Sequence, residues 1–314
     1  MNILVTGGAG FIGSHLCDRL IARGHTIFAA DDFSLGRRSN VAHLDDHPRF
    51  NLFELDVADQ KALDEVFQAN DIECVFHMAA NSDIARSHSD PSVDLKNTFL
   101  TTYSVLDAMR RYGCKKLVFA STSAIYGAAP GEIREDHGPL QPISHYGAGK
   151  LASEGFITSF GENYGIQSWI TRFPNVIGDR ATHGVIFDFV NKLVKTPGCL
   201  NVLGDGTQEK PYLFVSDLVD AILIAWDNGD DQVNVYNVGP VERSSVAFIA
   251  ETVAKEFGGA PEIRYSGGSR GWIGDVPKFE YDTGKIRALG WKPSMTSDEA
   301  VVRTTKILVE AARR

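Results

Sequence analysis

The sequence has few cysteines, no long hydrophobic run and fewer basic than acidic residues. Its four cysteines, at positions 17, 74, 114 and 199, show no CxxC spacing, which disfavours a zinc site or a redox dithiol. No apolar run approaches the roughly 18 residues that a transmembrane helix needs. With 31 basic and 40 acidic residues the net charge is −9, so the surface has no general attraction for nucleic acid or an anionic membrane. A secreted disulfide scaffold, a membrane protein and a basic nucleic-acid binder are excluded.

What remains is a chain of 314 residues with an ordinary globular composition, 43% hydrophobic and 23% charged. That length is about twice the common domain size of ~150 residues, so it allows one large α/β unit with an additional lobe. The first predicted strand begins at Asn2, which leaves no room for a signal peptide. Together with cysteines that are expected to be reduced thiols, this indicates a cytoplasmic protein.

The first 172 residues alternate short apolar runs with amphipathic stretches. This is the pattern of parallel strands joined by helices, and right-handed crossovers then produce a doubly wound sheet. We therefore expect an α/β protein in which residues 1–172 form a Rossmann domain. The predicted strands are 3–5, 26–30, 50–55, 74–77, 116–120 and 168–171, and the predicted helices are 11–22, 60–68, 93–112 and 144–163.

Beyond residue 172 the pattern loosens, and glycine and proline interrupt it at several points, for example at 196–198 and 204–206. We expect residues 173–314 to be mainly a smaller α/β lobe that binds the substrate, with some segments returning to the Rossmann unit. Helices are predicted over 216–226, 246–257 and 298–313, the last with Ser297 as its N-cap.

A glycine-rich loop lies between the first predicted strand and the first predicted helix. Gly7, Gly10 and Gly13 follow the spacing G-x-x-G-x-x-G. In dinucleotide-binding loops the first glycine allows a tight turn, the second lets a pyrophosphate approach the backbone, and the third lets helix and strand pack closely. Amides at the helix N-terminus then attract the phosphates, whatever the net charge of the protein.

An acidic residue at the end of the second predicted strand selects the cofactor. Asp31 stands eighteen residues after Gly13, where a carboxylate accepts the ribose hydroxyls of NAD and repels a 2′-phosphate. Asp32 follows it and strengthens the preference for NAD, whereas Arg37 and Arg38 keep NADP open as an alternative.

A tyrosine and a lysine stand four residues apart at Tyr146 and Lys150, on one face of a predicted helix. A neighbouring ammonium and a positive nicotinamide ring favour the phenolate, and we expect them to lower the tyrosine pKa. Upstream, residues 116–120 lead into a loop rich in hydroxyl groups that contains Thr122. The carboxyl ends of parallel strands are where such folds bind ligands, so these groups predict one shared site.

Three segments together resemble the extended short-chain dehydrogenase/reductases, in the branch of NAD-dependent nucleotide-sugar epimerases and dehydratases. They are TGGAGFIGSHL at 6–16, ASTSAIYG at 120–127 and YGAGK at 146–150. The likeness continues through 77–80, Asn97, 172–176, 203–206, 212–217 and 289–291, and is greatest to UDP-glucose 4-epimerase-like proteins.

The resemblance implies an NAD-binding enzyme in which Thr122 fills the catalytic Ser/Thr position, Tyr146 is the base and Lys150 tunes it. Asn175 would contact the phosphate or sugar of a nucleotide-diphosphate sugar. Lys210 lies where relatives usually carry an arginine on the diphosphate, Arg270 would give a second phosphate contact, and Phe279 lies near the position that limits the sugar C2 substituent. The residues assigned to NAD are Gly7, Gly10, Phe11, Ile12, Gly13, Asp31, Asp56, Val57, Ala79, Asn97, Tyr146 and Lys150.

The expected reaction begins with oxidation of the sugar at C4 to a 4-keto sugar. Similar 4,6-dehydratases carry Asp-Glu directly after the catalytic threonine, and decarboxylases carry Glu at the first of these positions. Here they are Ser123 and Ala124, which favours return of the hydride to the other face, that is, 4-epimerisation of the UDP-glucose/UDP-galactose type. A dehydratase, a decarboxylase and an epimerase of another sugar, such as a uronic acid, remain alternatives.

A regulator that senses NAD without catalysis is a further alternative, which the retained Thr122, Tyr146 and Lys150 disfavour. The resemblance also implies a homodimer formed through the helices predicted over 93–112 and 144–163. No metal site is predicted, because His43 and His47 have a suitable helical spacing but no third ligand nearby.

Overall fold

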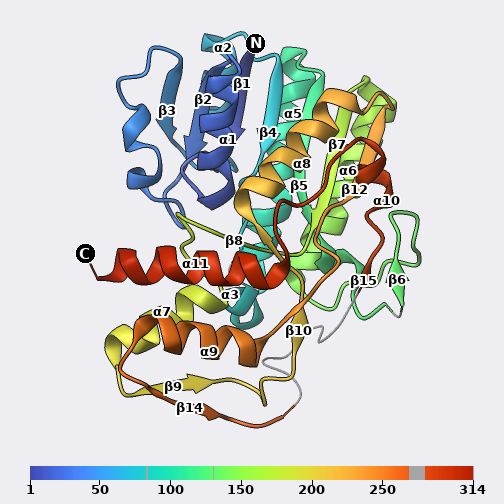
Figure 1. The fold of residues 1–314 in the computed structure, drawn as a ribbon. Helices are drawn as coiled ribbons and strands as arrows, with labels where there is room; N and C mark the ends of the chain where they lie inside the picture. The colour runs from blue at the N-terminus through green and yellow to red at the C-terminus, as the bar shows by residue number, and fades with distance from the viewer. Residues whose placement is uncertain (83, 130, 269–279, 314) are drawn as a thin grey trace.

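A computed structural model describes residues 1–82, 84–129, 131–268 and 280–313. Its central sheet has seven strands in the order β12-β7-β5-β4-β1-β2-β3, and every pairing in it is parallel (Figure 1). The expected Rossmann-type α/β fold is confirmed. The strands are β1 (Asn2–Thr6), β2 (Thr26–Asp31), β3 (Phe50–Glu54), β4 (Cys74–His77), β5 (Lys116–Thr122), β7 (Gln167–Phe173) and β12 (Val233–Asn237).

The strands are almost continuously apolar because helices cover both faces of the sheet. Along β1, Ile3 and Val5 belong to the core on one face and Leu4 to the core on the other, and all three are fully buried. α1 (Phe11–Ala22) and α8 (Val215–Asn228) cover the first face. The second face is covered by α2 (Gln60–Ala69), α5 (Thr101–Tyr112) and α6 (His145–Tyr164).

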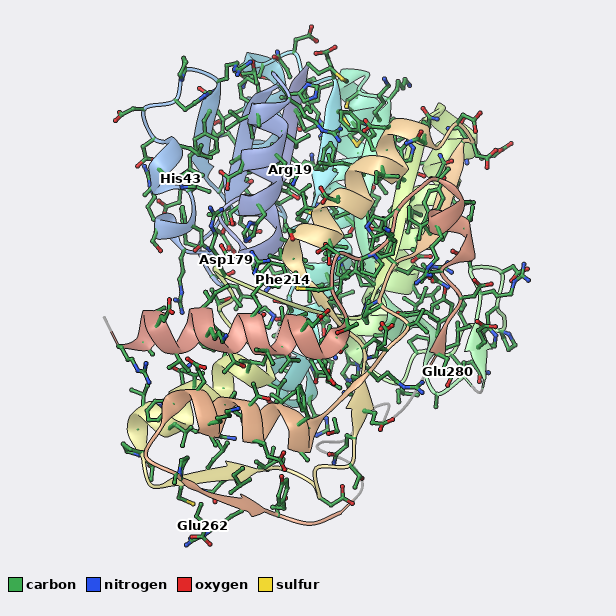
Figure 2. The ribbon with its side chains drawn as sticks, in the orientation of Figure 1. Arg19, His43, Asp179, Phe214, Glu262 and Glu280 are labelled. Carbon is green, nitrogen blue, oxygen red and sulfur yellow. The ribbon has the colours of Figure 1, made fainter. Side chains whose placement is uncertain are left out.

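Two ion pairs join α1 to α8 at their exposed sides, although the helices are about two hundred residues apart in the sequence. Arg19, labelled in Figure 2, pairs with Asp220, and Arg23 pairs with Asp227 at 2.8 Å. A segment from the C-terminal half is thus fixed against the first helix of the chain.

A second layer lies below the sheet in Figure 1 and has its own core. Three helices supply most of this core: α7 (Val185–Lys195), α9 (Val246–Phe257) and α11 (Ser297–Ala312). They pack with two parallel pairs, β8 (Asn175–Ile177) with β11 (Tyr212–Phe214) and β9 (Cys199–Val202) with β14 (Glu262–Tyr265). The other strands and α-helices among the described residues are β6 (Glu132–Ile133), β10 (Glu209–Lys210), β13 (Ser244–Ser245), β15 (Glu280–Tyr281), α3 (Ile84–Ser89), α4 (Ser92–Asp94) and α10 (Gly284–Ala288).

All six predicted strands lie in the sheet, but the sequence pattern did not reveal β12 or α7. The single helix predicted over 93–112 is also wrong in detail. The chain there forms α4, then a π-helical turn over Leu95–Leu100, and then α5. Side-chain periodicity does not distinguish this wider turn from an ordinary α-helical one.

The predicted N-cap at Ser297 is wrong by one residue. Thr296 caps α11 through a capping box, since its hydroxyl accepts from the Glu299 amide at 3.3 Å and the Glu299 carboxylate accepts from the Thr296 amide at 2.8 Å. Ser297 is the first helical residue, and its hydroxyl instead accepts from the Tyr212 amide at 3.1 Å.

Among the residues that the structure describes, no helix is both long enough and apolar enough to cross a membrane.

Candidate active site

A cleft of about 600 Å³ opens at the carboxyl ends of the sheet strands and extends to the lobe. Ligands of open parallel sheets bind at this edge, where neighbouring crossovers diverge to opposite faces. Its lining contains fifteen of the site residues predicted from the sequence. They are Gly7, Gly10, Phe11, Ile12, Gly13, Asp31, Asp56, Val57, Ala79, Asn97, Thr122, Tyr146, Lys150, Asn175 and Lys210.

The glycine loop has the shape that a dinucleotide requires. Gly7 has φ +66°, and a Cβ there would lie 2.9 Å from the Ala79 amide nitrogen. A Cβ on Gly13 would lie 2.1 Å from the Gly7 carbonyl oxygen, so the close packing of α1 on this loop excludes any side chain. The amides of the loop itself, from Gly7 to Gly10, donate to groups within the protein, whereas the first turn of α1, from Phe11 to Gly13, lines the cleft and fits the pyrophosphate of NAD.

Asp31 ends β2 and lies at the same edge of the sheet. Its carboxylate accepts from the Ala9 amide at 3.0 Å and from the Phe33 amide at 2.9 Å. Burial raises its pKa, and these amides act in the opposite direction. A carboxylate has about four acceptor positions, so it keeps acceptor capacity for a ribose hydroxyl beside these amides.

The two arginines that left NADP as an alternative cofactor have other side-chain partners. Arg37 stacks over the Phe187 ring at 5.7 Å, and Arg38 forms an ion pair with Asp45 at 3.2 Å. Neither is among the described residues that line the cleft. Asp56 does line it, and its carboxylate pairs with Lys96 at 3.0 Å.

Tyr146 is brought to the end of β5 by a close helix contact. Ser144 caps α6, since its hydroxyl accepts from the Gly147 amide at 3.1 Å. A Cβ on Gly147 would lie 2.6 Å from the Ala124 carbonyl oxygen, so glycine is what lets α6 approach the turn after Thr122. The Tyr146 hydroxyl consequently lies where it can hydrogen-bond to the Thr122 side chain.

The prediction that neighbouring groups lower the Tyr146 pKa is wrong for the groups that the protein itself supplies, because their combined effect raises it. Burial and the negative charge of Asp94 raise this pKa, and the hydrogen bond with Thr122 lowers it only in part. The Lys150 amine lies 5.9 Å from the Tyr146 ring centre, but its charge does not outweigh the loss of hydration.

Lys150 is 1% exposed, which is rare for a lysine. Its amine donates to the Ala120 carbonyl at 2.6 Å and lies 4.6 Å from the centre of the Phe119 ring. Burial lowers its pKa to about 7, against the opposing charges of Glu154 and Asp94. The amine therefore gains or loses its proton close to neutral pH.

The lobe supplies the other wall of the cleft. Asn175 on β8 and Tyr212 on β11 are paired in register, and Lys210 ends β10 two residues before Tyr212. Thr182 and His183, before α7, also line the cleft and were not predicted, because a loop residue carries no periodic signal. The predicted substrate residues Arg270 and Phe279 lie outside the described residues.

Comparisons with known proteins agree with this geometry. A sequence model of the NAD dependent epimerase/dehydratase family matches residues 3–239. A curated relative from Methanocaldococcus jannaschii, described as a putative UDP-glucose 4-epimerase, is 33% identical, with 96% of each chain covered. Proteins described as decarboxylases and dehydratases of nucleotide sugars also match.

Solved structures are similar over nearly the whole chain. A crystal structure of a UDP-galactose 4-epimerase has a TM-score of 0.88 at 37% identity, with 99% of each chain covered. The UDP-glucose 4-epimerase of Thermus thermophilus in complex with NAD has a TM-score of 0.86 at 32% identity, covering 98% of this chain and 99% of that one.

Proposed function

The chain belongs to the NAD dependent epimerase/dehydratase family, and from this premise we propose that it is a nucleotide-sugar 4-epimerase that interconverts UDP-glucose and UDP-galactose. The family predicted from the glycine loop and the Tyr-Lys pair is thereby confirmed, and the protein is an NAD-dependent enzyme. The relatives described as 4-epimerases, at 30–37% identity over nearly the full length, support the reaction.

We assign the NAD site to the edge formed by β1, β2 and β4. Asp31 would accept the ribose hydroxyls, and the loop from Gly7 to Gly13 would hold the pyrophosphate. When bound, NAD supplies a hydride acceptor and a positive charge beside the phenol. Arg37 and Arg38 are engaged elsewhere, which favours NAD over NADP.

We assign the proton transfer at the sugar C4 hydroxyl to Tyr146. Thr122 would orient both that hydroxyl and the phenol, to which its side chain can hydrogen-bond. Lys150 would stabilise the phenolate that Tyr146 needs to act as a base, because its ammonium lies on the same face of α6. Asn175 and Lys210 would hold the nucleotide diphosphate from the side of the lobe.

The observation that favours epimerisation is the distribution of carboxylates in the cleft. Among the described lining residues the acidic ones are Asp31, which ends β2, and Asp32 and Asp56, which come after β2 and β3. β5 carries Thr122 and is separated from β2 by β4 and β1 in the sheet. The positions after Thr122 are Ser123 and Ala124, so no carboxylate there assists loss of water or of CO₂. The 4-keto sugar is then left to rotate and regain hydride on its other face.

The direct test is to incubate the purified protein with UDP-glucose and to follow the sugar signals by NMR. We expect UDP-galactose to form until equilibrium is reached, without net consumption of NAD. A 4-keto-6-deoxy sugar or a pentose as the product would contradict the proposal.

A Tyr146→Phe variant separates the enzyme from a sensor of NAD. The loss of the phenol should lower turnover by about 10²–10⁴-fold, the usual size of a lost general acid–base group. NAD content and UDP-glucose binding, measured on the same preparation, should be retained. Full turnover in this variant would exclude Tyr146 as the base.

We also propose that the enzyme is a homodimer formed through α5 and α6. Phe156 and Tyr103 are 40% and 41% exposed, and their rings are 6.0 Å apart between the two helices. Phe99, Phe160 and Tyr164 extend the same aromatic cluster. Exposed aromatic clusters of this kind are typical of protein–protein interfaces.

The division into an NAD-binding domain over 1–172 and a substrate lobe over 173–314 is part of the proposal. The separate core of α7, α9 and α11 supports it, while α8 and β12 pack with the sheet. A cytoplasmic location is proposed as well, and the four unpaired cysteines support it.

A further inference from the structure

Asp94 is a buried carboxylate to which the proposed reaction assigns no role. It ends α4, directly before the π-helical turn, and is 1% exposed. Its Oδ1 accepts from the Asn81 amide at 3.1 Å and from the Thr98 hydroxyl at 2.8 Å. Its Oδ2 is also buried but has no hydrogen-bond partner among the described residues. A buried carboxylate with a free oxygen is costly unless a charge nearby compensates it.

The surrounding packing places Asp94 beside the catalytic helix. A Cβ on Gly149, the neighbour of Lys150, would lie 3.4 Å from the Asp94 carbonyl oxygen. The same Cβ would lie 3.1 Å from the Thr98 side chain, so α6 packs directly on this segment. The absence of a side chain at residue 149 allows this approach.

Glu154 is the other carboxylate near Lys150 and also raises the Lys150 pKa, but it is paired with an arginine, which Asp94 is not. Its oxygens accept from the Arg172 Nε at 3.1 Å and from Nη2 at 2.6 Å, and Ser121 donates to the same carboxylate. Glu154 and Arg172 thus form a buried pair with no net charge. Among the described residues no arginine or lysine, Lys150 included, lies within 4.0 Å of the Asp94 carboxylate, so its charge is not neutralised by a direct ion pair and acts on Lys150 through the buried space between them.

We propose that Asp94 is a positioning residue of the catalytic centre, whose buried carboxylate is a second counter-charge, beside Glu154, that favours the ammonium form of the Lys150 amine. The role of that ammonium in turnover rests on the proposed function, whereas the effect of Asp94 on the protonation of Lys150 does not depend on that function. Asp94 and Lys150 are both almost fully buried, so water screens their attraction little.

The pKa directions agree with this geometry. Burial lowers the pKa of Lys150 to about 7, and the charges of Glu154 and Asp94 raise it. Asp94 also raises the pKa of Tyr146. His77 is fully buried and its pKa is lowered to about 3, so it is neutral at pH 7. The groups that face Lys150 are Tyr146 and Glu154 from α6, His77 from β4, Asp94 from α4 and, through Glu154, Arg172 from β7.

The test is an NMR titration of the protein labelled with ¹³C at lysine Cε. Lys150 titrates near neutral pH, apart from ordinary lysines, and its signal is identified by its loss in Lys150→Met. In Asp94→Asn, at matched NAD content, we expect the Lys150 midpoint to fall by about one pH unit. An unchanged midpoint would overturn the proposal.

Two further variants test whether the effect comes from the charge. Thr98→Val removes a hydrogen bond to Asp94 but keeps the carboxylate, so the Lys150 midpoint should stay where it is. Asp94→Ser removes the charge with a smaller side chain and should lower the midpoint as Asp94→Asn does. An equal fall in Thr98→Val would mean that packing is responsible, and would reject the proposal. Because Asp94→Ser gives a second neutral side chain, misfolding of Asp94→Asn alone leaves the test intact.

Turnover of UDP-glucose gives an independent readout. In Asp94→Asn the alkaline limb of the kcat profile should move to lower pH, whereas in Thr98→Val the limb should keep its position. If the Lys150 midpoint falls in Asp94→Asn while the wild-type protein has no epimerase turnover, the role of Asp94 is supported and the proposed function is contradicted. Failure of the Asp94 proposal and failure of the proposed epimerase function are therefore distinguishable.

Discussion

At the scale of single residues, burial of Lys150 makes the stability of the fold depend on pH. Its pKa is lowered to about 7 in the folded protein, and it returns to the ordinary value near 10.5 when the chain unfolds. Between these values the unfolded chain binds a proton that the folded protein does not hold. Raising the pH across this interval therefore favours the folded state. Below pH 7 both states hold the proton, and the cost of the buried charge is fully present.

We predict that Lys150→Met flattens this dependence. From pH 7 to 9 the wild-type free energy of unfolding should rise relative to the variant, by at most about 1.4 kcal/mol per pH unit for one proton. Urea unfolding at matched pH values measures the difference. Parallel profiles for the two proteins would show that Lys150 is charged to the same extent in both states.

Residues with a fixed spacing could be predicted from the sequence, whereas isolated residues could not. Gly7, Tyr146 and Lys150 were found because their chemistry requires a defined separation along a turn or a helix. Asp94 and His183 carry no such pattern, and only the fold brings them to the cleft or to the catalytic helix. The direction of the Tyr146 pKa was missed because a sequence does not show how completely a phenol is buried.

At the scale of elements, two glycines in helices have opposite surroundings. A Cβ on Gly13 in α1 would lie 2.1 Å from a backbone oxygen, whereas a Cβ on Gly155 in α6 would meet nothing within 4 Å. The first glycine is required by packing, and the second only lowers helix propensity.

Alanine at each position should therefore have opposite effects on stability. We expect Gly13→Ala to destabilise the protein by about 1–3 kcal/mol through overpacking. Gly155→Ala should stabilise it by about 0.5–1 kcal/mol. Thermal unfolding of the two variants beside wild type measures both, and a rise in the midpoint for Gly13→Ala would contradict the close approach of α1 to the loop.

Most of the elements could be predicted, but not their irregularities. The strands of the Rossmann half are short apolar runs between turn signals, which periodicity detects well. The π-helical turn over Leu95–Leu100 and the cap at Thr296 depend on local hydrogen bonds, which the periodicity of apolar residues does not reveal. β12 was missed because its alternating residues follow a loop in the less regular half of the chain.

At the scale of the whole molecule, the aromatic cluster on α5 and α6 predicts the assembly. Phe156→Asp places a charge in the middle of the proposed interface, and we expect it to convert the dimer to a monomer. Light scattering after gel filtration measures the mass. Tyr265→Asp is the matched control, because Tyr265 is also 40% exposed but lies on β14, away from the cluster. A wild-type mass of one chain would reject the dimer.

The place of β12 in the sheet also has a consequence for synthesis. β12 pairs with β7 through Val233–Asn237, sixty residues after β7 ends at Phe173. While the ribosome makes the intervening lobe, the outer edge of β7 has no neighbouring strand, and an open edge invites pairing with other chains. The nascent chain thus passes through a period of exposure to misassembly, which ends only when residue 237 has left the ribosomal tunnel.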